Sequence, residues 1–179
     1  GAQRAAGWLH ALPAAHQSAD DADALVALAD LAHMAGAARD DAAILAQALA
    51  AYHAGDNDMA ATIFDAYTLE RSGDEAPVLS ARFLALLAHK DAGRVKQAGD
   101  GLDELATRWP LLADYASFFA GAAHLQAKRY EDAVRSLQRV PEDSTVRGRA
   151  LAVYARALAC VDPKALIEVD EAPVAVVVE

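Results

Sequence analysis

The sequence predicts an all-α protein in which antiparallel helix hairpins stack side by side. Alanine, the residue with the strongest helix preference, is abundant throughout, and the alternation typical of β-strands is almost absent before residue 165. Ala60, Ala98 and Ala133 each lie five residues after a turn, at spacings of 38 and 35 residues (98 − 60 and 133 − 98). A recurrence of about this length indicates a repeated pair of helices.

The N-terminal part of the chain contains two expected helices before the repeats begin. A short amphipathic pattern in residues 1–17 is cut by Pro13. A second pattern starts at Ser18, whose side chain offers an oxygen to free backbone N–H groups, and runs to Gly36. Apolar residues at helical spacing and turn residues then predict helices over about 40–54, 59–71, 77–91 and 95–108.

The stretch 113–141 carries the clearest hairpin. Two helical patterns are separated by a short basic turn at Lys128 and Arg129. Close approach of two helices requires small side chains at the crossing point, and Gly121 and Ala133 supply them. A further helix is expected to start at 142–144 and to continue through residue 158, followed by a last short helix after 162–163.

This stretch holds two small residues, Gly121 and Ala133, an aromatic residue, Tyr130, and a large apolar residue, Leu137. These are the residue types that the pattern of a tetratricopeptide repeat (TPR) requires at the corresponding positions, and the stretch resembles that family. The family pattern recurs twice upstream, with Leu86 where a small residue is usual. The resemblance implies a right-handed TPR-like α-solenoid of about three repeats in 41–145. Flanking helices or a partial repeat are expected in 1–40, capping helices in 146–168, and an extended tail or linker in 169–179.

The resemblance also implies a binding face. In this family the first helix of each repeat lines a concave surface that takes a segment of a partner protein. The corresponding residues here are Leu45, Leu49, Tyr52, His53, Phe83, Leu87, Lys90, Tyr115, Phe118, Leu125 and Gln126. Two interpretations remain open: an apolar groove that receives a peptide, or a set of core residues covered by flanking helices.

Other function classes find little support in the sequence. A formal net charge of −10 argues against nucleic acid, and no apolar run reaches the ~18 to 20 residues that direct insertion into a membrane requires. The six histidines lack the close spacing of metal ligands, and His89 and His124 are interpreted as residues of helix interfaces. Cys160 is expected to be buried. We predict a protein without enzymatic activity, cofactor or metal.

The valine-rich segment 173–179 differs from the rest because β-branched residues favour an extended chain. It can be a linker, a strand through which two copies associate, or a frayed end. The overall expectation is a protein-interaction scaffold of a bacterial secretion, export or envelope assembly, in the periplasm or else the cytoplasm. Two alternatives are the helical scaffold of a larger enzyme, similar to that of lytic transglycosylases, and a small secretion chaperone. The side chains that clamp a terminal carboxylate in chaperone-binding relatives are missing.

Overall fold

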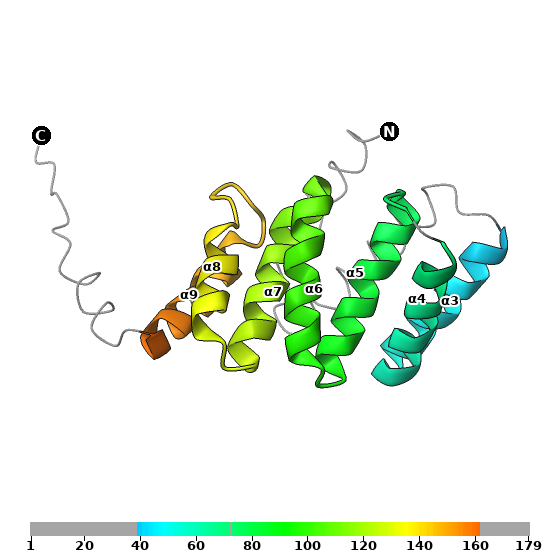
Figure 1. The fold of residues 1–179 in the computed structure, drawn as a ribbon, viewed down its shortest axis with the longest axis horizontal. Helices are drawn as coiled ribbons and strands as arrows, with labels where there is room; N and C mark the ends of the chain where they lie inside the picture. The colour runs from blue at the N-terminus through cyan, green and yellow to red at the C-terminus, as the bar shows by residue number, and fades with distance from the viewer. Residues whose placement is uncertain (1–38, 72, 162–179) are drawn as a thin grey trace, which may run out of the picture.

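The computed structural model describes residues 39–71 and 73–161. Within these ranges the chain forms seven α-helices and one 3-10 turn, with no strand. The helices follow one another in chain order along the long axis of the molecule (Figure 1). The prediction of an all-α chain is therefore confirmed for the described part.

Six of the helices form three consecutive pairs joined by short turns. The pairs are α3 (Arg39–His53) with α4 (Asn57–Glu70), α5 (Ala76–Asp91) with α6 (Val95–Arg108), and α7 (Ala113–Gln126) with α8 (Tyr130–Gln138). The 3-10 turn η1 (Pro110–Leu112) leads into α7, and α9 (Arg147–Val161) follows α8. Each helix packs against the next, and α7 also packs against α5 and α9.

The tight turns inside the three pairs share one backbone conformation. Gly55, Gly93 and Lys128 lie at the same place in these turns, with φ of 79°, 86° and 60°. Glycine adopts this left-handed region without penalty, whereas Lys128 does so against the usual preference of a residue that carries a Cβ. The side chain of Asp56 also accepts a hydrogen bond from the backbone N–H of Met59 (3.1 Å) and so caps α4.

The small residues singled out in the sequence lie inside the structure. Ala60, Ala98 and Ala133 are fully buried. A Cβ added to Gly121 would lie 2.3 Å from Cγ of Leu137, a side chain that is only 1 % exposed. Glycine at 121 is therefore what lets α7 and α8 approach closely.

The unusual Leu86 has a compensating partner that the sequence analysis did not identify. A Cβ added to Gly101 would lie 2.5 Å from Cδ2 of Leu86. In the α5–α6 pair the large side chain thus sits on the first helix and the glycine on the second. Each of the two pairs therefore sets one leucine against one glycine, although the order along the chain is reversed.

Two expectations from the sequence are wrong. The helix expected from 142–144 begins instead at Arg147, after a turn in which Ser144 donates its hydroxyl to Asp114 (2.5 Å) and accepts a hydrogen bond from the backbone N–H of Val146 (3.3 Å). Cys160 is exposed on α9, although Ala157 of the same helix is fully buried. The expected helices of 1–38, the short helix after 162–163 and the tail 169–179 lie outside the described residues. No helix in the described ranges is long and apolar enough to cross a membrane.

Candidate functional site

The aromatic residues expected on the concave face lie deep in the structure. Phe83 is fully buried, and its ring contacts that of Phe119 edge-on, with the centroids 5.9 Å apart. Phe118 is 5 % exposed, and its ring centroid is 5.0 Å from that of Phe119. These rings hold α5 and α7 together. The other buried members of the expected set are Leu45, Leu87 and Tyr115.

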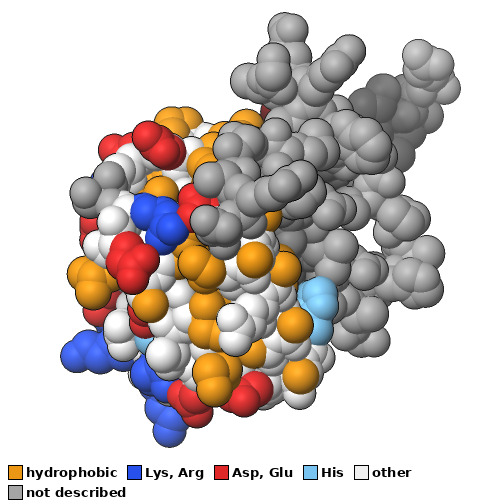
Figure 2. Space-filling model, turned by 90° about the vertical axis from the view of Figure 1, so that its right-hand side faces the viewer, with side chains coloured by type: hydrophobic (Ala, Val, Ile, Leu, Met, Phe, Trp, Pro, Cys, Tyr) orange, Lys and Arg blue, Asp and Glu red, His pale blue; other side chains and the backbone are white. Residues whose placement is uncertain are grey.

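The remaining expected residues are accessible to different degrees. Tyr52 and Lys90 are partly buried, and both bond to Asp91, which ties α3 to α5. His53 and Gln126 are exposed, and Leu49 and Leu125 are partly buried. Seen from the end formed by α3 and α4, hydrophobic side chains gather over the middle of the molecule, with charged ones around them (Figure 2).

One pocket includes part of this expected face. It lies between α7, the turn after it, the start of α8, and α9, and has a volume of about 520 Å³. The residues that line it are Ala122, Leu125, Gln126, Lys128, Tyr130, Val153, Arg156 and Cys160. Among the expected partner-binding residues, the structure therefore brings Leu125 and Gln126 together with side chains of α9 that the sequence analysis did not connect to them.

A second pocket, of about 450 Å³, lies between α4 and α6 with α5 at its floor. Its lining combines polar and apolar side chains and carries charges of both signs, including Asp65, Arg82, Glu104 and Arg108. Three of these are already engaged within the molecule, because Arg108 pairs with Glu104 (3.4 Å) and Asp65 contacts His89 (2.8 Å). The net charge of these four side chains is zero.

The helix pairs are joined to one another by histidine–aspartate contacts. At the first joint, Nε2 of His89 on α5 lies 2.8 Å from a carboxylate oxygen of Asp65 on α4. Arg94 donates its Nε–H to Nδ1 of the same ring (2.6 Å) and also pairs with Asp58. Both ring nitrogens of His89 are therefore engaged, and the interpretation of this histidine as an interface residue is confirmed.

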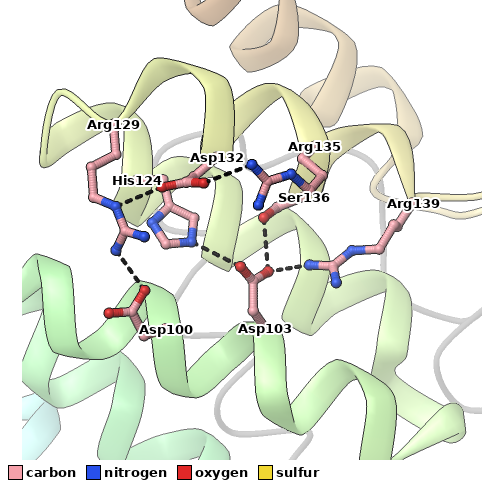
Figure 3. Close-up of polar contacts among 8 residues, drawn as sticks. All are labelled: Asp100, Asp103, His124, Arg129, Asp132, Arg135, Ser136 and Arg139. Carbon is pink, nitrogen blue, oxygen red and sulfur yellow. Dashed lines mark hydrogen bonds and ion pairs between the residues drawn. The ribbon is translucent and has the colours of Figure 1, made fainter.

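The second joint repeats the contact in a larger network (Figure 3). Nε2 of His124 on α7 lies 2.9 Å from Asp103 on α6, which also accepts a hydrogen bond from Ser136 of α8 (2.7 Å) and pairs with Arg139. His124 is fully buried, and its Nδ1 has no hydrogen-bond partner among the described residues. Asp103 thus links three consecutive helices.

The charge state of Asp103 follows from these contacts. Burial alone would raise its pKa, but the hydrogen bonds from His124 and Ser136 and the positive charge of Arg139 outweigh burial and lower the pKa of Asp103 below its ordinary value. The carboxylate therefore remains ionised under neutral and mildly acidic conditions. Its charge stabilises the contact between α6, α7 and α8.

The residue types of this network are those of a catalytic triad, but the geometry is different. In a triad the serine hydroxyl bonds to the histidine ring, and the aspartate orients that ring from the other side. Here Ser136 and His124 both bond to Asp103. The cluster therefore cannot pass a proton from Ser136 to His124, and its contacts serve to hold helices together. Among the described residues there is no group of three or more side chains suited to hold a metal ion.

Sequence reasoning gave no role to Asp65 and Asp103, and it identified Lys128 only as part of a basic turn. A signal for the first two was present, because Asp65 and Asp103 lie five residues after Ala60 and Ala98, the alanines used to define the repeats. Lys128 lies where the other two turns have glycine, and that difference was also readable. What could not be read is that Arg156 of α9 lines the same pocket as Lys128.

Comparisons with known proteins do not assign this chain to a family. No protein-family model, no curated protein and no solved structure matches it.

Proposed function

We propose that this chain is a TPR-like helical-repeat scaffold that binds a segment of another protein. The observation that carries the proposal is the packing of first helices on one another: α7 contacts both α5 and α9 in addition to its own pair partner. When successive hairpins pack in this way, their first helices form one continuous face. The shared turn and the buried alanines of the three pairs support the same assignment.

The contact surface we propose is narrower than the face implied by the resemblance. Phe83, Leu87 and Phe118 are buried and hold the helices together, so a partner would meet the side chains around them. The exposed residues of the expected face are His53 on α3 and Gln126 on α7, and Leu125 beside Gln126 is partly buried. A bacterial secretion, export or envelope assembly remains the setting that we propose for the scaffold.

Site-specific photo-crosslinking in the source cells tests the proposal. A photoreactive phenylalanine analogue is placed at His53 or Gln126, and, as a control, at Gln97, which is exposed on α6. We expect the same partner polypeptide to be captured from His53 and Gln126 but not from Gln97. Two results would contradict the proposed function. One is that no polypeptide is captured from His53 or Gln126, and the other is that the same polypeptide is also captured from Gln97.

A change at Phe83 or Phe118 would be a poor test of binding. Replacing a buried aromatic ring with alanine typically costs about 3–5 kcal/mol of stability. A loss of binding in such a variant would report on folding. The exposed positions His53 and Gln126 avoid this ambiguity.

A further inference from the structure

We propose that the pocket between α7, α8 and α9 recognises an acidic and apolar peptide segment of the partner, whose carboxylates pair with Lys128 and Arg156. The inference rests on the proposed scaffold function and names the chemistry of the bound segment. It is carried by the juxtaposition, in one pocket, of an apolar floor and two cations that make no ion pair with a described residue.

The first argument is charge. The pocket lining contains two cationic side chains and no aspartate or glutamate, in a protein whose formal net charge is −10. Most arginines in the described ranges already pair with carboxylates: Arg71, Arg94, Arg108, Arg129, Arg135 and Arg139. Lys128 and Arg156 make no such pair within the described part of the chain. An incoming carboxylate would find two cations that no acid of residues 39–71 or 73–161 neutralises.

The second argument is the backbone at Lys128. The other two turns place glycine at this position, and a side chain there costs roughly 1–2 kcal/mol because the left-handed conformation brings Cβ too close to the following carbonyl oxygen. The turn needs no lysine for its fold, since Gly55 and Gly93 make the same turn. Residues held in such sparsely populated backbone conformations cluster at active sites and ligand-binding sites.

The third argument selects a peptide over an inorganic anion. Ala122, Leu125 and Val153 form an apolar part of the lining, and Tyr130 and Gln126 add polar groups that can bond to a peptide backbone. A phosphate ion would use the two cations and leave this apolar surface uncovered. A segment that alternates acidic and apolar side chains would use both. The clamp positions of chaperone-binding TPR proteins are different, and here they hold apolar residues such as Leu45.

The chain carries a built-in reporter for this pocket. Cys160 is the only cysteine of the sequence, it is exposed, and it lines the pocket. A ligand that occupies the pocket should therefore shield the thiol from alkylation by a neutral reagent such as iodoacetamide. Mass spectrometry of the full chain gives the rate of this modification directly.

The experiment uses a defined probe, an acetylated and amidated peptide of alternating aspartate and leucine. We expect it to slow alkylation of Cys160 in a saturable way. In the variant Lys128→Gly, Arg156→Gln, half-protection should require at least about tenfold more peptide, because both charged contacts are gone. Glycine suits the backbone at 128, and Arg156 is exposed, so the variant should fold. The control Lys96→Gln, exposed on α6, should behave as wild type.

Several outcomes would overturn the inference. They are the absence of protection, equal protection by the corresponding asparagine–leucine peptide or by inorganic phosphate, and unchanged protection in the double variant. Replacing Glu168, Asp170 and Glu171 by their amides provides another arm. If that change accelerates alkylation without any peptide, the pocket receives the chain's own C-terminal segment, and the assignment to a partner is wrong.

The scaffold function can be separated from this inference. Photo-crosslinking from Gln126 is repeated in the Lys128→Gly, Arg156→Gln background. If the partner is still captured there while the acidic peptide gives no protection, the scaffold function stands and acidic recognition is rejected. If the partner is lost from His53 and Gln126 even with the wild-type pocket, the scaffold function itself is rejected.

Discussion

The α5–α6 pair and the α7–α8 pair reach the same close packing by opposite routes. In the former, Leu86 of the first helix lies over Gly101 of the second. In the latter, Leu137 of the second helix lies over Gly121 of the first. The contact requires one leucine opposite one glycine, and either helix can supply the glycine. A repeat pattern that requires a small residue only on the first helix therefore describes the α7–α8 contact but not the α5–α6 contact, in which the glycine is on the second helix.

The joints that precede these two pairs differ as well. His89 keeps both ring nitrogens engaged because Arg94 donates to Nδ1. At the later joint, Arg129 turns away from the ring of His124 and bonds to Asp132 (2.7 Å), and the orphan Nδ1 is fully buried. At the later joint, the carboxylate of Asp103 contacts His124, Ser136 and Arg139. The stability of this joint should therefore depend more on charge than that of the earlier one.

The largest expected effect is at the leucine of the α7–α8 pair. Leu137→Ala should lower the free energy of unfolding by about 2–5 kcal/mol, because it removes a side chain that is 1 % exposed and leaves a cavity. Leu86→Ala should cost less, since Leu86 is only partly buried. Urea unfolding followed by circular dichroism measures both. Leu69→Ala, at a position that is 85 % exposed, is the control, and a loss there equal to that of Leu137→Ala would contradict this account.

The two glycines should respond differently to the same change. At Gly121 an added Cβ meets Cγ of Leu137, the branch point of that side chain, which cannot move aside as a terminal methyl can, so Gly121→Ala should cost about 1–3 kcal/mol. At Gly101 the closest atom is a terminal methyl of Leu86, which can move, so Gly101→Ala should cost less.

A double-mutant cycle isolates the Gly121 clash. In the Leu137→Ala background, Gly121→Ala should no longer be destabilising, because the space it needs has been vacated. Denaturant unfolding of the four proteins of the cycle gives the coupling energy. A coupling energy of zero would mean that Gly121 and Leu137 do not define the contact.

The third prediction concerns pH. The pKa of Asp103 is lower in the folded protein than in the unfolded chain, so its contribution to stability is present above the unfolded-state pKa of about 3.9 and is lost as the pH falls through the folded-state pKa. Asp103→Asn should therefore cost about 1–3 kcal/mol near pH 7 and progressively less as the solution is acidified below about pH 4.

Unfolding at a series of pH values checks this prediction. Asp143→Asn, in the exposed turn before α9, serves as the control and should leave the acid dependence unchanged. A deficit for Asp103→Asn that stays constant between pH 7 and strongly acidic solution would show that the charge of this carboxylate does not stabilise the joint.

The smallest effect is expected in the turns. Lys128→Gly should raise stability by up to about 1 kcal/mol, because it relieves the left-handed strain but adds freedom to the unfolded chain. Gly93→Lys should lower stability by a similar amount, because it introduces that strain into the preceding turn. Thermal unfolding monitored for both proteins tests the pair. If both changes destabilise, the two turns are not interchangeable.

The helices of the described ranges were predictable from local signals. Apolar spacing placed α3 to α8 within a few residues, and Gly55, Gly93 and Pro77 marked where helices end or begin. Burial of Ala60, Ala98 and Ala133 could be predicted because a repeated small residue after a repeated turn has a packing cause. The start of α9 was placed a few residues too early, because the turn before it is held by the hydrogen bond from Ser144 to Asp114 of α7, a contact 30 residues away that no local pattern shows.

Periodicity and turn chemistry act within a few residues, and so the amino-acid order alone was sufficient to establish an all-α chain of helix pairs and the small residues inside them. Other features depend on how separate helix pairs pack against one another. They are the burial of Phe83 and Phe118, the position of Asp103 among three helices, and the presence of Lys128 and Arg156 in one pocket. Such contacts join residues about 20 to 30 positions apart or more, and no local pattern encodes the distance between them in space. The binding face was therefore visible in the sequence as a set of candidates, and only the packing divided that set into core residues and accessible ones.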